Sequence, residues 1–407
     1  MFLVYINDIV DGKNGKIKLF ADDTALYVDV ENRAEAENIL SQDLKTLEKW
    51  SKKWILQFNA TKTVKMRLSL KKASELPSLN LCGKELASVE TYKHLGLTFN
   101  TKLTFKDHIN EIAIKANRKI DVMKRLKYSV DRKTLEVLYI SFVRPVLEYA
   151  NVIWDNCDKN DKQLLENTQL NAARVVTGAI RGTSHKEIYK ETGWQLLSDR
   201  RECQQLLLFH KMVHGLTPQY LQDLVPIRVG KITNYPVRNR NNLYQIHCRI
   251  EIYKNYFLPK MIRKWNSLPL DVRSIENHVH FKRKLFKNGP KANPLFYMGN
   301  RKMNIIHARM RMKCSILKGH LYNLHVVDSP NCECGLGEED VEHYIFHCPL
   351  YVRSRDVLFH NLRQVVNMND ITVDRLLYGG TDSIETDKIL LESLHSYIKN
   401  SGRFDNM

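Results

Sequence analysis

Two adjacent acidic residues, Asp22 and Asp23, have the types and spacing that most directly suggest chemistry. They lie between the apolar runs 17–20 and 25–28, a pattern that predicts a strand, a tight turn and a second strand with both carboxylates at the tip. Carboxylate oxygens are the ligands that Mg²⁺ favours. Two metal ions held in this way can stabilise the attacking and leaving oxygens of a phosphoryl transfer. The alternative is an ordinary turn, because Asp is common in turns.

A second group of residues has the types of metal ligands. Cys332, Cys334, His343 and Cys348 form the string Cys-x-Cys, eight residues, His, four residues, Cys. Thiolates and imidazoles suit Zn²⁺, and four such ligands make a closed structural site rather than a catalytic one. A short helix would carry His343, His347 and Cys348 on one side. The alternative is that the thiols are core residues and the histidines are incidental.

The charge of the chain is basic and unevenly distributed. Its 63 Lys and Arg and 45 Asp and Glu give a formal net charge of +18 at pH 7, which favours a polyanionic partner. Residues 328–407 carry −7, whereas residues 1–327 carry +25. Between Glu276 and Asp328 there are eleven Lys and Arg and no acid, so this run repels itself unless something neutralises it. The alternative is a solvated face. The candidate nucleic-acid contacts are Arg118, Lys119, Arg125, Arg283, Lys284, Arg309 and Arg311.

The composition excludes several classes of protein. The chain is 43% hydrophobic and 27% charged, which is typical of folded domains and not of a disordered chain. Most of its eight cysteines are isolated in sequence, so a disulfide scaffold and an oxidising compartment are not indicated. The first ten residues include Asp8 and lack the basic region of a signal peptide, so none is expected. No apolar run approaches the ~18 residues needed to span a membrane. We expect an intracellular protein, in the nucleus or the cytoplasm.

The spacing of apolar residues predicts an α+β chain of two or three domains. Its first hundred residues combine the hairpin with a helix and short strands, and the rest is mainly helical. Residues 226–245 lack periodicity and are expected to be a linker or a loop that faces nucleic acid. The expected helices are 33–56, 105–127, 131–150 with a break at Pro145, 164–177, 198–214, 252–287 and 301–318. The expected strands are 64–68, a pair around Cys82-Gly83, and 92–97.

Several motifs recur in the order found in one known family. These are Phe2-Leu3-Val4-Tyr5-Ile6-Asn7-Asp8, Phe20-Ala21-Asp22-Asp23-Thr24, Trp50 and Trp54 with Phe58-Asn59 and Lys62, Tyr92-Lys93-His94-Leu95-Gly96, Phe142 to Tyr149, Trp265-Asn266-Ser267-Leu268-Pro269 and the Cys/His cluster. The series resembles the reverse transcriptases of non-LTR retrotransposons of the jockey and CR1 kind. The resemblance covers nearly the whole chain, and the ordered series is more specific than any one motif.

The resemblance implies a polymerase that copies RNA into DNA with Mg²⁺, bound to an RNA template and a DNA primer. It implies a partial palm at 1–103, a helical thumb at 104–225, a basic extension at 226–327, and a zinc-like module with an acidic helical tail at 328–407. It does not indicate an oligomeric state.

The resemblance also implies roles for single residues. Asp22 and Asp23 would hold Mg²⁺, and Phe20 and Ala21 would set the hairpin beside the primer end. Lys62 would lie near the phosphates of the incoming nucleotide, and otherwise it is a solvated lysine at a strand edge. His94 and Gly96 would touch the primer backbone, and otherwise they form a buried turn.

The chain also departs from the family pattern. Only 21 residues precede Asp22, so we expect the fingers and the first catalytic Asp to be absent. The metal ions supply most of the charge stabilisation, and we therefore expect no polymerisation by this chain alone. The alternatives are a non-catalytic nucleic-acid-binding remnant and a zinc-stabilised protein-interaction module. Nucleic-acid binding that weakens steeply with salt would argue against the last.

Overall fold

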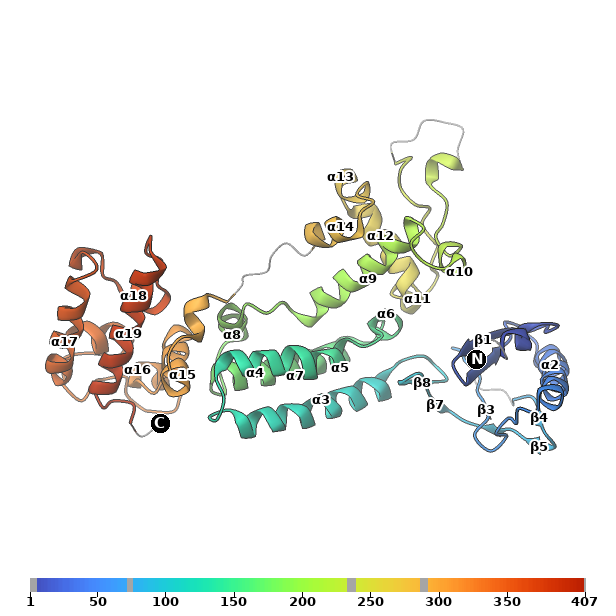
Figure 1. Ribbon diagram of the computed structural model, residues 1–407, viewed down its shortest axis with the longest axis horizontal. Helices are drawn as coiled ribbons and strands as arrows, with labels where there is room; N and C mark the ends of the chain where they lie inside the picture. Colours follow the sequence, from blue (N-terminus) through green and yellow to red (C-terminus); the bar gives the residue numbers. More distant parts are fainter. Residues whose placement is uncertain (1–5, 72–75, 233–238, 286–291, 406–407) are drawn as a thin grey trace. The chain divides into compact units, whose positions relative to one another are not determined.

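The computed structural model describes residues 6–71, 76–232, 239–285 and 292–405 (Figure 1). The described residues form two compact units, Met1–His108 and Ile109–Met407. Three expected features fall partly outside the described residues: the segment before the hairpin, the linker 226–245 and the basic run. The structure confirms a mixed α+β chain. Among the described residues, no helix has both the length and the apolar character that crossing a bilayer requires.

The first unit combines one long helix with short strands. The described part of this unit contains four two-stranded sheets. They pair β1 with β2, β4 with β5 and β7 with β8 in antiparallel fashion, and β3 with β6 in parallel. Its elements are η1 (Asn7–Val10), β1 (Lys16–Phe20), β2 (Asp23–Tyr27), α2 (Arg33–Trp54), β3 (Val64–Lys65), β4 (Asn80–Leu81), β5 (Lys84–Glu85), β6 (Ala87–Ser88), β7 (Thr91–His94) and β8 (Leu97–Asn100).

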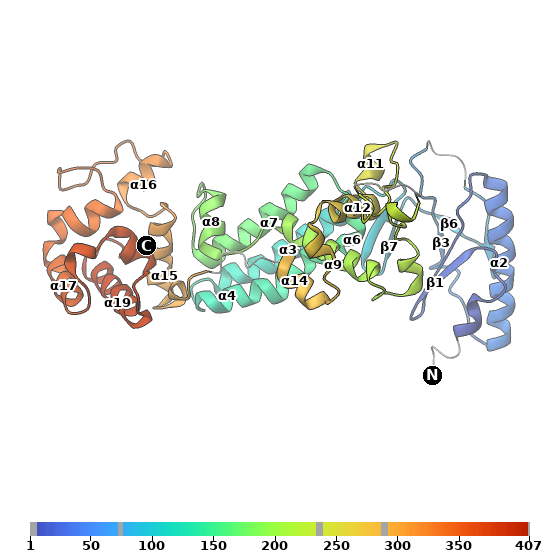
Figure 2. The same cartoon turned by 90° about the horizontal axis from the view of Figure 1, so that it is seen from above.

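The core of the first unit is built from α2, η1 and the segment 79–86, and partly buried residues of the β1–β2 hairpin pack against it. The hairpin and α2 are neighbours in both views (Figure 1 and Figure 2). The Asn32 side chain caps α2 by accepting from Ala34 N, which satisfies one of the free N–H groups at the helix start. The apolar stripe of α2 includes Leu44 and Leu47, which are buried against alternate residues of β1. One face of the β1–β2 hairpin therefore packs toward α2.

The expected single strand at 92–97 is wrong. These residues form two strands, β7 and β8, joined by the turn Leu95-Gly96, in which both residues have positive φ, 47° and 80°. A two-residue hairpin turn with positive φ at both positions matches the twist of the strands, and Gly adopts that backbone without strain. Gly96 therefore reverses the chain here.

The second unit is helical. Its elements are α3 (Lys106–Leu126), which begins in the first unit, α4 (Arg132–Leu138), η2 (Tyr139–Val143), α5 (Arg144–Glu148), α6 (Asn151–Trp154), α7 (Lys159–Thr177), α8 (His185–Thr192), α9 (Leu197–Val213), α10 (Gln219–Gln222), η3 (Val229–Lys231), α11 (Glu251–Lys254), α12 (Phe257–Ser267), α13 (Leu270–Arg273), α14 (His278–Leu285), η4 (Pro294–Tyr297), α15 (Arg301–Arg311), α16 (Lys318–Asn323), η5 (His343–His347), η6 (Pro349–Tyr351), α17 (Val352–Arg363), η7 (Met368–Asp370), α18 (Val373–Tyr378) and α19 (Ile384–Asn400).

The helix expected over 131–150 begins as predicted with α4, and a wider, π-helical turn follows. Asp131 caps α4 by accepting from Thr134 N at 2.7 Å. Before Pro145 the chain makes one π-helical turn, η2, in which Arg144 N donates to Tyr139 O. Proline lacks an N–H and its ring clashes with the carbonyl four residues earlier. The wider turn accommodates that clash, and the helical path continues through α5.

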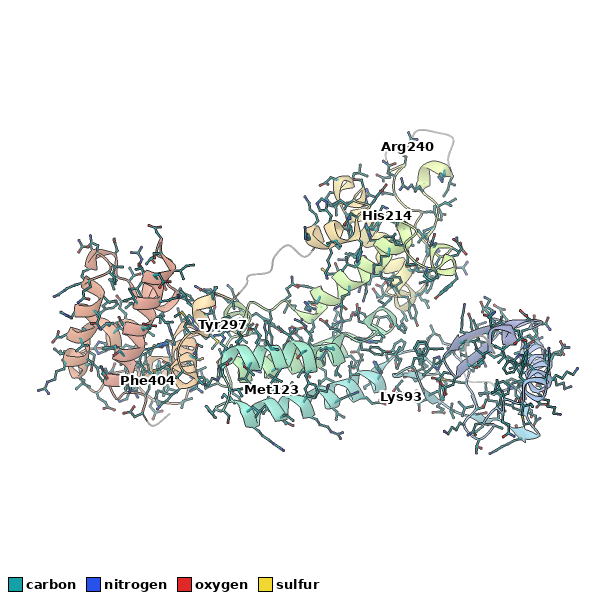
Figure 3. The ribbon with its side chains drawn as sticks, in the orientation of Figure 1. Lys93, Met123, His214, Arg240, Tyr297 and Phe404 are labelled. Atoms are coloured by element: carbon teal, nitrogen blue, oxygen red, sulfur yellow. The ribbon has the colours of Figure 1, made fainter. Side chains whose placement is uncertain are left out.

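The expected division at residue 327/328 runs through one hydrophobic core. Met303 and Ile306 of α15 pack in the same cluster as Tyr344, Leu390 and Phe404 of the C-terminal helices. Phe404, which is labelled in Figure 3, is 2% exposed in that cluster. Because α15 supplies part of this core, it packs with the C-terminal helices, and through Ala308 it also packs with α7 and α8.

A buried carboxylate joins three helices of the second unit. Glu191 of α8 accepts from Arg311 of α15 at 2.6 and 2.8 Å, and it also pairs with Arg132 of α4. All three side chains are at most 2% exposed. Burial raises the pKa of Glu191, but the two guanidinium groups outweigh burial and the pKa lies below its ordinary value. Glu191 therefore stays ionised inside the fold.

Replacing Glu191 with Gln leaves the buried charges of Arg132 and Arg311 uncompensated. We expect Glu191→Gln to lower the free energy of unfolding by about 3–5 kcal/mol, measured by urea denaturation. The matched control is Glu202→Gln, because Glu202 pairs with Lys264 at 2.9 Å in a solvent-exposed position and surface pairs contribute about 0–1 kcal/mol. Equal losses in the two variants would contradict this assignment.

A buried histidine predicts a loss of stability in acid. His210 on α9 is fully buried and contacts the Ile275 carbonyl through Nε2 at 2.6 Å. Burial lowers the pKa of His210, and His214, His278 and Lys211 lower it further. The unfolded imidazole, with a pKa of about 6.5, therefore binds a proton before the folded one does. We expect the free energy of unfolding to fall as pH drops below about 6.5, measured by urea denaturation at several pH values.

The control for this prediction is His210→Gln, which keeps a side-chain N–H donor but cannot titrate. Its stability should change less between neutral pH and pH of about 5 than that of the wild type. A pH dependence identical in the two proteins would assign the titration to other groups.

Candidate metal sites and nucleic-acid contacts

Asp22 and Asp23 lie at the tip of the β1–β2 hairpin, as the sequence predicts. Phe20 pairs with Asp23 at the end of the ladder, so Ala21 and Asp22 form a two-residue turn. Ala21 has a φ of 52°, in the left-handed region that is costly for residues with a side chain and that recurs at functional sites. Both carboxylates are exposed, and Phe20 is 63% exposed beside them.

The base of the hairpin is tied to α2 by a buried carboxylate. Asp43 is 1% exposed and accepts from the backbone N–H groups of Asn14 at 2.9 Å and Gly15 at 2.7 Å. A side chain at Gly15 would meet Asp43 Oδ2 at 2.8 Å, so the close approach needs glycine. These bonds set where β1 begins and therefore where the tip lies.

Asp8 has a structural role that the sequence did not reveal. Its two carboxylate oxygens accept from Trp50 Nε1 at 2.7 Å and Trp54 Nε1 at 3.1 Å. The indoles are four residues apart on α2 and reach the same carboxylate, since residues at that spacing share a helix face. The Trp pair, expected only as core packing, thus also holds η1 against α2.

The hairpin supplies two carboxylates but no complete metal site. Within the described residues, the only group of three or more His, Cys, Asp or Glu side chains arranged to hold a metal ion is the Cys/His cluster. Asp22 and Asp23 therefore fit Mg²⁺ as a partial ligand set that needs oxygen ligands from elsewhere.

The other residues expected beside the primer and the nucleotide lie on separate elements. Lys62 is exposed in a turn closed by Asn59, whose Oδ1 accepts from Lys62 N at 3.2 Å. His94 ends β7 half-buried, and Gly96 lies in the turn that follows. The roles of Lys62, His94 and Gly96 stay predictions.

The four predicted zinc ligands come together in the structure. The ligand atoms of Cys332, Cys334, His343 and Cys348 all lie within 4.8 Å of one another. Cys332 Sγ and Cys348 Sγ are 3.6 Å apart, and Cys334 Sγ is 3.2 Å from His343 Nε2. Two thiolates bound tetrahedrally to zinc at about 2.3 Å lie roughly 3.8 Å apart. The donor set and its spacing therefore fit a structural zinc ion.

A tight loop and a wide helical turn position these ligands. Cys332 N donates to Gly337 O at 2.8 Å and Gly335 N to Cys332 O at 3.0 Å, so the loop brings both cysteines to one side. In η5, Cys348 N donates to His343 O at 2.7 Å, five residues earlier. This π-helical turn, a type frequent at functional sites, places residues 343 and 348 on the same side.

His347 does not join the cluster, which corrects the expected one-sided helix. It is exposed at the end of η5 and lies outside the ligand group, because the wide turn rotates it away. Behind the ligands, Arg355 donates to the carbonyls of Ile345 and Cys348. Burial raises the pKa of the Cys348 thiol to about 12, so a bound metal ion must displace its proton.

Comparison with known proteins gives several polymerases of mobile elements. The probable RNA-directed DNA polymerase from transposon BS of Drosophila melanogaster is 28% identical over 195 residues, 45% of this chain and 21% of its own length. The RNA-directed DNA polymerase from mobile element jockey of the same species is 27% identical over 173 residues, 42% of this chain and 19% of its own. A retrovirus-related Pol polyprotein from type-1 retrotransposable element R1 of Bradysia coprophila is 22% identical over 369 residues, 84% of this chain and 32% of its own.

This chain is related to the RNA-directed DNA polymerases of non-LTR retrotransposons. It spans about a fifth to a third of the length of these relatives. No protein-family model matches the chain, and no solved structure matches it significantly.

The cations expected to contact nucleic acid divide into two groups. Arg118 and Arg125 on α3 and Arg283 and Lys284 on α14 are exposed. Lys119 is half-buried, and its Nζ donates to Phe142 O at 2.8 Å. The exposed four keep the surface position that a contact with a polymerase template or primer requires.

The three arginines of α15 are directed into the fold, which corrects the expectation for Arg309 and Arg311. The Arg311 side chain is 2% exposed and pairs with Glu191. Arg309 Nε donates to Gly178 O at 2.8 Å, at the end of α7. Arg301 donates to the carbonyls of Val175 and Val176 at 2.8 and 2.7 Å.

Helix ends explain why α15 is basic and lacks acids. Carbonyls at a helix C-terminus carry partial negative charge and need donors. Arg301 and Arg309 supply donors to the end of α7, and burial lowers the pKa of Arg301 to about 10. The three arginines of this helix therefore have partners within the protein: carbonyls for Arg301 and Arg309, and Glu191 for Arg311.

The Cys/His cluster predicts tight binding of one metal ion. Titration with Co²⁺ should give one equivalent with an intense thiolate-to-metal band in the near ultraviolet, and Zn²⁺ should displace the Co²⁺ because it binds more tightly. Cys348→Ser should remove the band, since it removes one of the thiolate ligands.

The matched control is Cys82→Ser, because Cys82 is exposed and lies in the other unit. It should bind Co²⁺ as the wild type does. A band that survives Cys348→Ser, or that depends on Cys82, would show that the four residues do not form the site.

Proposed function

We propose that this chain is the part of a non-LTR retrotransposon reverse transcriptase that carries the metal-binding hairpin, the helical thumb and the Cys/His module. The observation that carries this proposal is the hairpin with Asp22 and Asp23 exposed at its tip, in a chain whose relatives are RNA-directed DNA polymerases. The R1 relative supports applying this proposal to most of the chain, because the matched region covers 84% of it.

In the polymerase, Asp22 and Asp23 would hold Mg²⁺, which supplies charge stabilisation to the phosphoryl transfer. Ala21, with its left-handed backbone, and the exposed Phe20 would lie beside the primer end. Lys62 would neutralise phosphate charge of the incoming nucleotide, with His94 and Gly96 on the primer backbone.

The nucleic-acid substrates would be an RNA template and a DNA primer. Exposed Arg118 and Arg125 on α3, with Arg283 and Lys284 on α14, would bind the phosphates of these strands. The module around Cys332 and His343 would hold Zn²⁺ as a structural ion. The non-catalytic remnant and the protein-interaction module gain no support from relatives that are RNA-directed DNA polymerases.

We propose further that the chain alone does not polymerise. The hairpin brings two carboxylates and, within the described residues, no third acidic, His or Cys side chain joins them. A two-metal site needs more oxygen ligands than two side chains provide. The further oxygen ligands would come from other groups of the polymerase.

Primer extension on an RNA template with Mg²⁺ tests this proposal. The 407-residue chain should give no extension above that of Asp22→Asn. Extension by the chain that is lost in Asp22→Asn would contradict the incomplete site and would still establish a polymerase.

A fusion tests the role of the hairpin directly. The chain would follow, in one frame, the fingers and the first part of the palm of the jockey polymerase. We expect RNA-templated extension that falls by several orders of magnitude in Asp22→Asn, since a metal ligand is lost. Asp29→Asn, an exposed acid just after β2, is the matched control and should retain activity. A folded fusion in which both variants behave alike would contradict the assignment of Asp22.

A further inference from the structure

A groove of about 770 Å³ lies in the second unit, between residues 239–254 and α12. Its volume is within the range of about 300–1,000 Å³ that is typical of ligand sites. Arg240, labelled in Figure 3, lies in the loop that leads into one wall. Neither the Asp-Asp hairpin nor the Cys/His cluster contributes to the groove.

One wall of the groove is held in place by Asn266, from the motif Trp265-Asn266-Ser267-Leu268-Pro269. Asn266 Oδ1 accepts from Leu243 N at 2.9 Å, and its Nδ2 donates to Leu243 O at 2.8 Å. The Leu243 side chain is buried with Trp265 in the core beneath. These two hydrogen bonds to the backbone of Leu243 anchor the segment 244–248 along α12. The segment itself is neither helix nor strand. The motif thus shapes the groove.

The lining of the groove combines cations with an exposed aromatic ring. Arg249 is exposed at one end, and Arg263 on α12 donates to Lys254 O at 2.6 Å. Tyr244 is 54% exposed, and His247 is exposed on the same segment. Cations attract phosphate, and every base can stack on an aromatic face.

The surroundings of the groove are also strongly basic. The described residues between 226 and 285 include twelve Lys and Arg and only three Asp and Glu. One of the three acids, Glu251, pairs with Lys254 at 3.2 Å in an exposed position. The excess of positive charge favours a polyanion over a protein or a neutral small molecule.

We propose that this groove binds single-stranded nucleic acid. Arg249 and Arg263 contact its phosphates and Tyr244 stacks on a base, which must be unpaired to expose its face. The site deepens the proposed function by naming a surface that holds an unpaired strand, and it rests on that function only for the presence of nucleic acid.

Two substitutions test the groove in the full chain. Binding of a labelled 12-residue oligo-U, oligo-dT and a 12-base-pair duplex is measured by fluorescence anisotropy at several salt concentrations. Tyr244→Ala should weaken single-strand binding by roughly fivefold or more, from the loss of one stacked base. Arg249→Gln should also weaken it and should reduce the slope of log affinity against log salt by about 0.7, for one lost phosphate contact with a single strand.

Matched controls remove the same groups elsewhere. Arg353→Gln takes an exposed arginine from α17, and Tyr322→Ala takes a tyrosine that is 45% exposed on α16. Both should bind the single strands as the wild type does. Circular dichroism and urea denaturation show whether each variant is folded.

The outcomes separate this proposal from the proposed function. A loss confined to oligo-U or oligo-dT, or shared by the two, supports the groove and identifies its strand as RNA, DNA or either. Unchanged binding in Tyr244→Ala and Arg249→Gln, or equal losses with duplex and single strands, overturns it. Binding of no nucleic acid by the wild type also overturns it. The proposed polymerase is judged independently, by extension with Asp22→Asn, whose hairpin lies in the other unit.

Discussion

The second unit depends on one buried charge. Glu191 of α8 pairs with Arg132 of α4 and Arg311 of α15, so a single carboxylate joins three helices that are distant in sequence. Because the two arginines cannot be buried without it, the arrangement of these helices is tied to one ionised side chain. Arg301 and Arg309 extend the same principle by binding carbonyls at the end of α7. Basic residues therefore hold this unit together, and they are not all available to nucleic acid.

The two candidate metal sites differ in how far the chain completes them. Four soft ligands meet around one point in the Cys/His cluster, on a loop and a π-helical turn that are held by backbone bonds. The hairpin presents only Asp22 and Asp23, although Asp43 anchors its base firmly. The first arrangement is typical of a structural ion. The second is typical of an active site that is assembled from several segments.

Much of the local structure followed from short-range patterns. The hairpin, α2, α3, α7 and α9 appear where apolar periodicity placed them, because each buries one face. The Cys/His cluster also formed as predicted, since four ligands that are close in sequence can be brought together by one loop and one helical turn. The single strand at 92–97 was wrong because Leu95 adopts positive φ, which its residue type does not indicate.

The sequence by itself determined the relation to reverse transcriptases, the position of the two carboxylates and the identity of the four possible zinc ligands. Only the tertiary structure decided how the basic residues are used. Arg311 and Arg283 are both arginines of the same basic run, yet Arg311 is buried against Glu191 and Arg283 is exposed. The partner of a charge is set by contacts across more than a hundred residues, and neither charge counting nor periodicity contains that information.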